Sequence, residues 1–240
     1  MKQGPLNLII IGGALVIGAL IYTFMLPEFI QKGGPLVAGL VALSIMVVTY
    51  VIERLLSLKK AGGNGPLPKF LKAIVQNLNA NDVAGAIAAC DKQRGSLANI
   101  IRTGLDRYQE LVAKKELNKK EKMEEVKRVI DEATMLEMPV LEKNLIALST
   151  IASISTMVGL LGTVIGMIRA FAALAHAGSA DATQLSQGIS EALINTAGGI
   201  ANAIIAIVSY NFFTTKIDGM TYMIDEASKD IIMNLEAKHE

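Results

Sequence analysis

Four long runs of apolar residues restrict what this chain can fold into more than any other feature of its sequence. A helix rises about 1.5 Å per residue, so about 20 apolar residues cross a hydrocarbon layer of about 30 Å. Of the 240 residues, 52% are hydrophobic, too many for a soluble protein of this size. The pattern predicts an all-α, polytopic helical membrane protein with four spans, or with three as the alternative. The runs cover residues 6–26 and 34–52, which hold no charge, 144–174, which holds only Arg169, and 188–213, which holds only Glu191.

The first run has two interpretations. Its position and the preceding Lys2 suit a signal peptide, which would be removed from the mature protein. However, the bulky residues 22–27 do not resemble a cleavage site of small residues. We therefore expect the first run to be retained as a membrane anchor.

The distribution of Lys and Arg predicts the orientation of the spans. Of the 23 basic residues, 16 lie in residues 57–143. The segments 27–33 and 175–187, by contrast, hold only Lys32. Because basic residues favour the cytoplasmic side of a membrane, we expect both termini and the long middle segment to be cytoplasmic.

The charged middle segment has the periodicity of short amphipathic helices. A glycine-rich breaker is followed by helical patterns over residues 67–79 and 82–92, and Asp82 has the position of an N-cap. Ser96 is expected to cap the next helix, which would run to Lys114. The middle segment therefore predicts a helical domain in water, with long helices extending into the cytoplasm.

A further charged helix begins near Asn118 and shows no strong stop before the third apolar run. We expect one long helix with a kink at Pro139, because proline removes a hydrogen bond inside a helix. Residues 216–238 predict another cytoplasmic helix. The expected domains are an N-terminal transmembrane helix with a short outer loop (1–33), a second transmembrane helix (34–56), a cytoplasmic helical domain (57–143), two transmembrane helices with a short outer loop (144–213) and a C-terminal cytoplasmic helix (214–240).

The fourth run carries polar residues along one face, although it lies in a predicted span. An ionisable group in a bilayer costs roughly 2.5–3.5 kcal/mol, so Glu191 is a candidate functional residue. Interhelical packing and a path for protons both stay open for this face. At about 100° per residue, its members fall within about 40° of the Glu191 direction. They are Gln184, Gln187, Glu191, Asn195, Gly198, Asn202 and Ser209.

The third run combines hydroxyl residues with glycines. Ser149, Thr156 and Thr163 recur every seven residues and therefore share one side of a helix. Gly162 and Gly166 form a Gly-xxx-Gly pair, which lets another helix approach closely. We accordingly assign helix packing to Gly159, Gly162, Gly166 and Gly198.

No enzyme-like or metal-binding constellation accompanies these residues. His176 and His239 fall in a predicted outer loop and in the terminal tail, without acids or cysteines at metal-ligand spacing. The single Cys90 cannot form an internal disulfide, and a net charge of +1 gives no sign of a nucleic-acid partner. We expect no enzymatic activity, no cofactor and no bound metal.

Three motifs are distributed over the last three runs. They are VIERLL at 51–56, GLLGTVIGMI at 159–168, and ISEALINTAGGI at 189–200, the last followed by Tyr210 and Asn211. With the order of spans and the large cytoplasmic insertion, the chain from residue 34 onward resembles the MotA/TolQ/ExbB proton-channel family, most closely its ExbB/TolQ branch. The resemblance implies that the last two spans of several subunits, typically five, line a pore that holds two single-span partners of the ExbD/TolR type.

The resemblance also implies roles for particular residues. Thr163, Glu191 and Thr196 match the family's pore-lining polar positions, whereas the partners carry an essential membrane aspartate. Asn195, Asn202 and Thr156 lie on the same polar faces and are added to the predicted proton path. The expected function is that of an ExbB-like subunit of a proton-driven motor in the bacterial inner membrane. It would perform work such as TonB-dependent outer-membrane transport, with a TonB-like protein as a further candidate partner.

Other interpretations stay open. A TolQ-like or MotA-like stator for envelope maintenance, gliding or secretion would share the motifs. A non-conducting scaffold would need no acid in a span, and a secondary transporter would show inverted repeats. The chain lacks the family's prolines at 155–158 and 203–206, and its first span is interpreted as a peripheral, lipid-facing addition. We expect a homo-oligomer, a pentamer by resemblance, because Glu191, Asn195 and Asn202 would lack partners in a lipid-exposed monomer.

Overall fold

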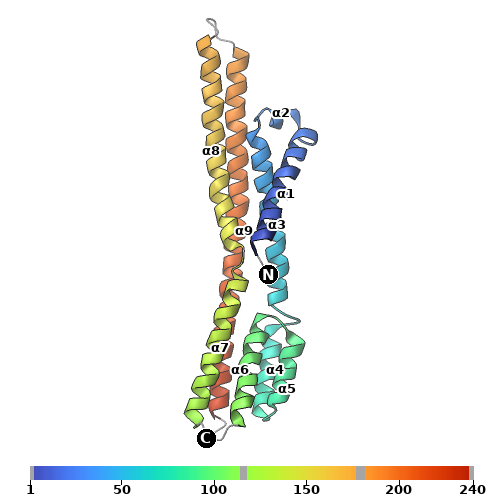
Figure 1. The fold of residues 1–240 in the computed structure, drawn as a ribbon, viewed down its shortest axis with the longest axis vertical. Coiled ribbons are helices and arrows are strands. Elements are labelled where there is room, and N and C mark those ends of the chain that lie inside the picture. Colours follow the sequence, from blue (N-terminus) through green and yellow to red (C-terminus); the bar gives the residue numbers. More distant parts are fainter. Residues whose placement is uncertain (1–2, 114–117, 177–181, 238–240) are drawn as a thin grey trace. The chain divides into compact units, whose positions relative to one another are not determined.

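The computed structural model describes residues 3–113, 118–176 and 182–237, and every regular element within them is a helix. This confirms the predicted all-α class. His239 and residues 177–181 of the predicted outer loop lie outside the described residues. In chain order (Figure 1) the helices are α1 (Gln3–Phe24), α2 (Glu28–Gln31), α3 (Leu36–Ala61), α4 (Leu67–Asn79), α5 (Val83–Gln93), α6 (Ser96–Val112), α7 (Lys119–Leu141), α8 (Leu145–His176) and α9 (Ala182–Ala237).

Three helical segments of the described chain are long and apolar enough to cross a membrane, namely those that contain α3, α8 and α9. α1 counts as a shorter apolar helix, over Ile10–Phe24. The polytopic helical architecture is thereby confirmed with three candidate spans, and a fourth span in residues 6–26 stays a prediction. The five expected domains also stay a prediction, because length and composition alone define the candidate spans.

The chain divides into two compact units, which we call unit 1 and unit 2. Unit 1 comprises Met1–Glu53 and Asn144–Phe212, and unit 2 comprises Arg54–Lys143 and Phe213–Glu240. Unit 1 therefore holds α1, α2, α8 and the N-terminal parts of α3 and α9. Unit 2 holds α4 to α7 with the C-terminal parts of α3 and α9.

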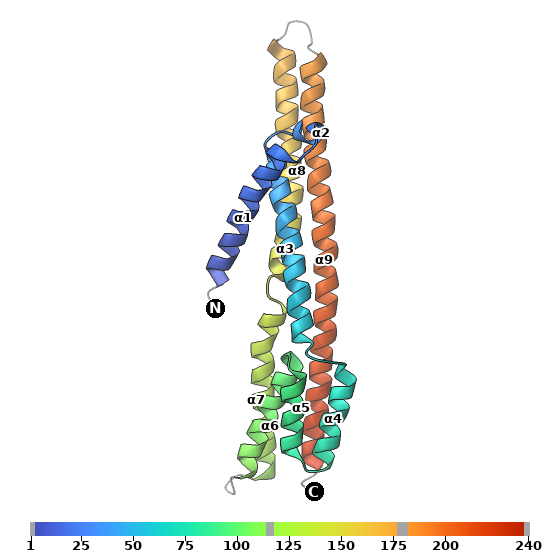
Figure 2. The same cartoon turned by 90° about the vertical axis from the view of Figure 1, so that its right-hand side faces the viewer.

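Small residues bring the helices of unit 1 close together. α8 and α9 run antiparallel and side by side, as Figures 1 and 2 both show. α1 meets α3 at Gly18, where an added Cβ would lie 2.9 Å from the backbone nitrogen of Ala42. Ala14 and Ala42 are buried at this contact. Residues without bulky side chains thus permit close packing between apolar helices, as is typical of membrane proteins.

Amphipathic helices bury an apolar core in unit 2. α6 packs against α5 and α7, and α4 packs against α5. The spacing that predicts a helix over 67–79 puts Phe70, Ile74 and Leu78 on the buried face of α4. The buried residues of α9 in this unit include three that recur every seven positions, as in a coiled-coil seam: Ile217, Ile224 and Ile231.

Two helix starts in unit 2 confirm the sequence predictions. The Asp82 side chain accepts a hydrogen bond from a backbone N–H in the first turn of α5, at 2.7 Å. At the start of α7, the Asn118 side chain accepts from the backbone N–H of Glu121, and the Glu121 side chain accepts from that of Asn118, both at 2.9 Å. Such reciprocal bonds satisfy donors that have no partner within the helix.

The start of α6 differs from its prediction. Gly95 is the N-cap, with φ of 87°, and Ser96 is already the first helical residue. Ser96 is buried and makes no capping hydrogen bond. The expected Ser96 cap is therefore wrong, because a positive φ at the preceding residue favours glycine there. The helix ends at Val112.

The expected continuous helix through Pro139 is also wrong. α7 ends at Leu141, and residues 142–144 form a turn before α8 begins. Pro139 lies inside α7 without ending it, whereas Asn144 adopts a left-handed φ of 61°, which asparagine tolerates better than most residues. In unit 2 the fully buried Arg54 donates through Nη1 to the carbonyl oxygen of Leu141 at 3.1 Å, which satisfies one group at the end of α7.

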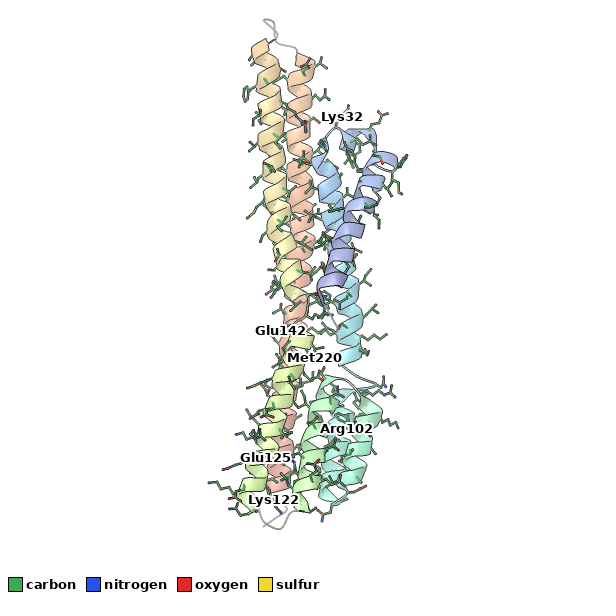
Figure 3. The ribbon with its side chains drawn as sticks, in the orientation of Figure 1. Lys32, Arg102, Lys122, Glu125, Glu142 and Met220 are labelled. Atoms are coloured by element: carbon green, nitrogen blue, oxygen red, sulfur yellow. The ribbon has the colours of Figure 1, made fainter. Side chains whose placement is uncertain are left out.

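A carboxylate shared by two arginines connects α6 and α7. Glu125, labelled in Figure 3, lies 2.7 Å from both Arg128 on its own helix and Arg107 on α6. Hydrogen bonds from Arg128 and Arg107 lower the pKa of Glu125 to about 2. The pair of arginines therefore favours the ionised form of Glu125 throughout the neutral range.

Candidate functional site

α8 and α9 approach closely because glycines stand at their contact. A Cβ added to Gly166 would lie 2.7 Å from the carbonyl oxygen of Gly188. One added to Gly159 would lie 3.1 Å from the carbonyl oxygen of Asn195, and one added to Gly162 would overlap the Asn195 side chain. Larger residues at these positions would push the helices apart, so the Gly-xxx-Gly spacing here serves close packing.

A pair of threonine hydroxyls lies at this contact. The Oγ1 atoms of Thr163 on α8 and Thr196 on α9 are hydrogen-bonded to each other, and either can be the donor. Both also lie within hydrogen-bond distance of the carbonyl oxygen of Gly159, at 3.2 Å and 3.3 Å respectively. Both threonines are half-buried. The two threonine hydroxyls, each with an exchangeable proton, and the carbonyl oxygen of Gly159 therefore lie together between two apolar helices.

An ion pair joins the same two helices. The Arg169 Nη1 atom lies 2.5 Å from Glu191 Oε1, and the side chains are 54% and 8% exposed. Gly34 closes over the carboxylate, because a Cβ added there would lie 2.5 Å from Oε1. The φ of 75° at Gly34 also favours glycine. The buried acid therefore has a cationic partner within its own chain.

Two asparagines of α9 bond to backbone carbonyls near α3. Asn195 Nδ2 donates to the carbonyl oxygen of Gly33 at 2.7 Å. Asn202 Nδ2 donates to the carbonyl oxygen of Leu40 at 2.8 Å, and its Oδ1 accepts from the Ser44 hydroxyl at 2.6 Å. Both asparagines are buried. These bonds hold α9 against the segment from Gly33 to Ser44.

The reason given above for an oligomer is therefore wrong. A single chain supplies partners for Glu191, for Asn202 and for the amide nitrogen of Asn195, so these groups do not require a second subunit. Within the described part of unit 1, two buried side-chain oxygens have no hydrogen-bond partner, Asn195 Oδ1 and Ser155 Oγ. Buried polar atoms are normally satisfied, so a water or a neighbouring donor is expected at each of them.

The predicted path residues do not form one cluster. Thr163 and Thr196 are in contact, whereas Glu191 lies five residues before Thr196, about 7.5 Å away along the axis of α9. Thr156 is exposed, donates to a carbonyl of its own helix at 3.3 Å and lines a separate hollow of about 350 Å³. Gly198 faces α3 instead of α8, because a Cβ added there would lie 3.2 Å from a leucine of α3.

Arg169 is the residue of the site that the sequence reasoning missed. In the sequence it stands out only as the one charge in the third run. Arg169 and Glu191 are the only charges in their runs, and both lie eleven positions from residue 180 in the predicted outer loop. Two helices joined by a short loop run antiparallel, so this symmetry of position could have indicated the pair.

The comparison with protein families gives a match over residues 92–226, more than half of the chain. The matching family is described as the "MotA/TolQ/ExbB proton channel family". The matched region includes the threonine pair, the ion pair and both asparagines. It also includes α6, α7 and α8.

Relatives among curated proteins have names from two branches of this family. The Tol-Pal system protein TolQ of Haemophilus influenzae is 39% identical over 39% of this chain and 41% of its own length. The biopolymer transport protein ExbB of Pseudomonas putida is 37% identical over 36% of this chain and 26% of its own length. A putative ExbB homolog of Methanothermobacter thermautotrophicus is 28% identical over 80% of this chain and 63% of its own length. The chain thus spans less than two thirds of each of these relatives.

Proposed function

Because the chain belongs to the MotA/TolQ/ExbB proton channel family, we propose that it is the ring-forming subunit of a proton-driven motor in the bacterial inner membrane. In this proposal several copies, five by resemblance, surround two single-span partners of the ExbD/TolR type. Both termini lie in the cytoplasm. The family is one of proton channels and not of enzymes, and no enzymatic reaction is proposed.

The observation that carries the proposal is the threonine pair between α8 and α9. Thr163 and Thr196 share the carbonyl oxygen of Gly159 and are half-buried, so one side of the pair is open to a neighbouring molecule. Hydroxyl groups both donate and accept hydrogen bonds, and can therefore relay a proton to or from a bound water. A partner aspartate in the pore would exchange its proton with this pair.

Glu191 and Arg169 are proposed to set the electric field beside that pair. Opposite charges at 2.5 Å largely cancel at long range, which reduces the cost of holding an acid among apolar helices. A partner's aspartate that approaches Arg169 would compete with Glu191 for the same guanidinium. A role of Asn195, Asn202 and Thr156 in proton passage stays a prediction, since the two asparagines already hold α9 on neighbouring carbonyls.

The work done by the motor follows from the membrane potential. A proton that crosses 100 mV releases about 2.3 kcal/mol, so about 10 kcal/mol of mechanical work requires several protons. Each change in the charge of the partner aspartate would alter how its helix fits the ring and would drive rotation or displacement of the helix pair.

Two versions of this function are supported by the names of the relatives. An ExbB-like subunit would energise TonB-dependent outer-membrane transport, and a TolQ-like subunit would energise envelope maintenance. TolQ and ExbB proteins align with this chain at similar identity, 39% and 37%. Purification of the complex from its native membrane, followed by mass spectrometry of the bound partners, distinguishes the two.

Proton flux through the purified complex tests the proposal. Thr163→Val and Thr196→Val remove a hydroxyl without changing the side-chain shape. We expect each to slow flux into proteoliposomes roughly tenfold, less than the 10²–10⁴-fold typical of a positioned acid or base, because water can replace a hydroxyl.

The matched control is Thr150→Val, also on α8. Its exposed hydroxyl donates to a carbonyl of its own helix at 2.7 Å and makes no hydrogen bond to the described residues of α9. Flux should be unchanged in this variant. Equal proton flux in the three variants and in the unmodified complex would contradict a proton path through the threonine pair. If the unmodified complex itself conducts no protons, a structural scaffold is favoured.

A further inference from the structure

A basic cavity lies in unit 2, at the end of α3 that follows the apolar stretch. Its volume is about 840 Å³. Lys59 and Lys60 of α3 and Arg94, which follows α5, contribute three cationic side chains to its lining. Leu56 and Val140 contribute apolar side chains that are 65% and 53% exposed. One cavity therefore combines positive charge with open apolar surface.

The cations of this cavity have no anionic partner in the part of the chain that the structure describes. Glu137 is the one acid among the lining residues, and its Oε1 accepts a hydrogen bond from Asn99 at 3.2 Å. Lys59, Lys60 and Arg94 make no ion pair with Glu137 or with any other described residue. The lining thus carries an excess of positive charge, which an external anion would neutralise.

The wall beside Arg94 is built by two glycine-containing loops in close contact. The backbone N–H of Asn64 donates to the carbonyl oxygen of Gln93 at 2.6 Å, and Gln93 Nε2 reaches the carbonyl oxygen of Gly65 at 3.3 Å. Gly63 has φ of 75°, and a side chain there would overlap the Arg94 backbone. These contacts hold Arg94 itself at φ of 56°, a conformation that non-glycine residues rarely adopt. The position of the Arg94 backbone is therefore fixed by its neighbours.

The level of the cavity along α3 corresponds to lipid headgroups. Lys59 and Lys60 come seven and eight residues after Ile52, the last residue of the apolar run. This separation is about 10–12 Å of helix, and long cationic side chains at that distance reach the headgroup layer. Basic pockets beside the cytoplasmic ends of spans are suited to anionic headgroups.

We propose that this cavity binds the phosphate group of an anionic phospholipid. Lys59, Lys60 and Arg94 bind the phosphate oxygens, and the exposed Leu56 and Val140 contact the first part of the acyl chains. A free phosphate would use only the cations and would leave the apolar surface uncovered, so the lining favours the lipid as the source of the phosphate. The inference does not depend on proton conduction.

Native mass spectrometry of the full chain in detergent tests this proposal. Phosphatidylglycerol and phosphatidylcholine with identical acyl chains are titrated separately, and soluble glycerophosphate is added as competitor. We expect phosphatidylglycerol to bind more tightly than phosphatidylcholine, and millimolar glycerophosphate to displace little of it. Lys59→Gln/Lys60→Gln/Arg94→Gln should weaken phosphatidylglycerol binding roughly tenfold to a hundredfold, at the strength that basic side chains have near anionic lipid.

The matched control removes three positive charges elsewhere in unit 2. Lys119, Lys120 and Lys127 are exposed on α7 and do not line the cavity. Their triple glutamine variant should bind phosphatidylglycerol as the unmodified chain does. Lys60→Gln alone serves as a second variant, because an exposed single substitution leaves the fold intact, and it should weaken binding by a smaller factor.

Three outcomes would overturn the proposal. Equal binding of the two lipids would show that charge does not select the ligand. Equal loss in the cavity variant and the α7 control would show that total charge, and not the cavity, is responsible. Displacement of phosphatidylglycerol by glycerophosphate at matched concentrations would show that the site takes soluble phosphate compounds instead of lipid.

Discussion

Replacing Arg169 and Glu191 by glutamine, singly and together, separates the packing role of this pair from a role in proton transfer. The two side chains lie 2.5 Å apart across α8 and α9, and the Glu191 side chain is only 8% exposed. Glutamine has nearly the shape of glutamate and still forms hydrogen bonds, but it carries no charge and does not titrate. The double variant therefore keeps a polar contact while it removes both charges.

The magnitude follows from the burial of the two partners. Breaking a fully buried pair from one side costs about 3–5 kcal/mol, and a hydrogen bond to a charged group contributes about 1.5–3 kcal/mol. Because the Arg169 side chain is 54% exposed, we expect Arg169→Gln to cost about 2–3 kcal/mol of stability. Glu191→Gln should cost less, about 1 kcal/mol, since the half-exposed guanidinium can turn towards water. In the double variant two amides can pair, and stability should return to within about 1 kcal/mol of the unmodified protein.

Two measurements are needed. Unfolding of the purified chain in mixed micelles, followed by circular dichroism, gives the stability of the four proteins. Growth that depends on the proton motive force gives their function in cells. We expect the double variant to be stable, assembled and inactive, because neither charge remains beside the threonine pair. A stable and fully active double variant would falsify a role of Glu191 in proton transfer, and a larger cost for Glu191→Gln than for Arg169→Gln would contradict the geometry of the pair.

Three further predictions concern helix packing, the threonine hydroxyls and the ion pairs of unit 2. Gly166→Ala should lower thermal stability by about 1–3 kcal/mol, because its Cβ would lie 2.7 Å from a carbonyl oxygen of α9. The control Gly39→Ala should leave stability unchanged, because a Cβ at position 39 would meet no atom within 4 Å. Equal melting temperatures of the two variants would contradict this prediction. Thr163→Ala should reduce energised growth several-fold and Thr163→Ser should preserve it, and equal growth of both variants would refute the need for a hydroxyl. Hydrogen bonds from Arg128 and Arg107 lower the pKa of Glu125 from 4.5 to about 2, so the stability contributed by this carboxylate is full above about pH 4.5 and is lost as the pH falls towards 2. Glu125→Gln should flatten the stability of the full chain over that pH range, as measured by circular dichroism.

The helices of unit 2 could be predicted from sequence because their determinants are local. Asp82 and Asn118 cap helices through bonds to residues three positions away. Phe70 and Ile74 recur at helical spacing on one face of α4. Where the prediction failed, the determinant was a backbone conformation. Gly95 replaces Ser96 as the cap at positive φ, and the turn at Asn144 interrupts the expected long helix.

The sequence predicts most residues of the candidate site, but it does not predict which residues they contact. The polar face of α9 was evident from periodicity, and Glu191 was singled out because charges in spans are costly. Its partner, Arg169, depends on the register of two helices, and the partners of Asn195 and Asn202 are backbone carbonyls of Gly33 and Leu40. A sequence pattern gives no information on which distant carbonyl will face a given amide. This is why the asparagines were expected to need a second subunit.

The two threonine hydroxyls and the carbonyl oxygen of Gly159 form a closed triangle of three oxygens that share two hydrogens. Thr163 can donate to Gly159 and accept from Thr196, or the two threonines can exchange these roles, and distances of 3.2 Å and 3.3 Å to the carbonyl favour neither arrangement. Switching between them requires only rotation of two O–H bonds, with no movement of a helix or of any heavier atom. A relay that has passed one proton must be reset before it can pass the next. Because the two hydrogen-bond arrangements have similar geometry, rotation of the hydroxyl groups restores the first arrangement without any repacking of the helices. The two states of such a relay would differ only in the positions of two hydrogen atoms.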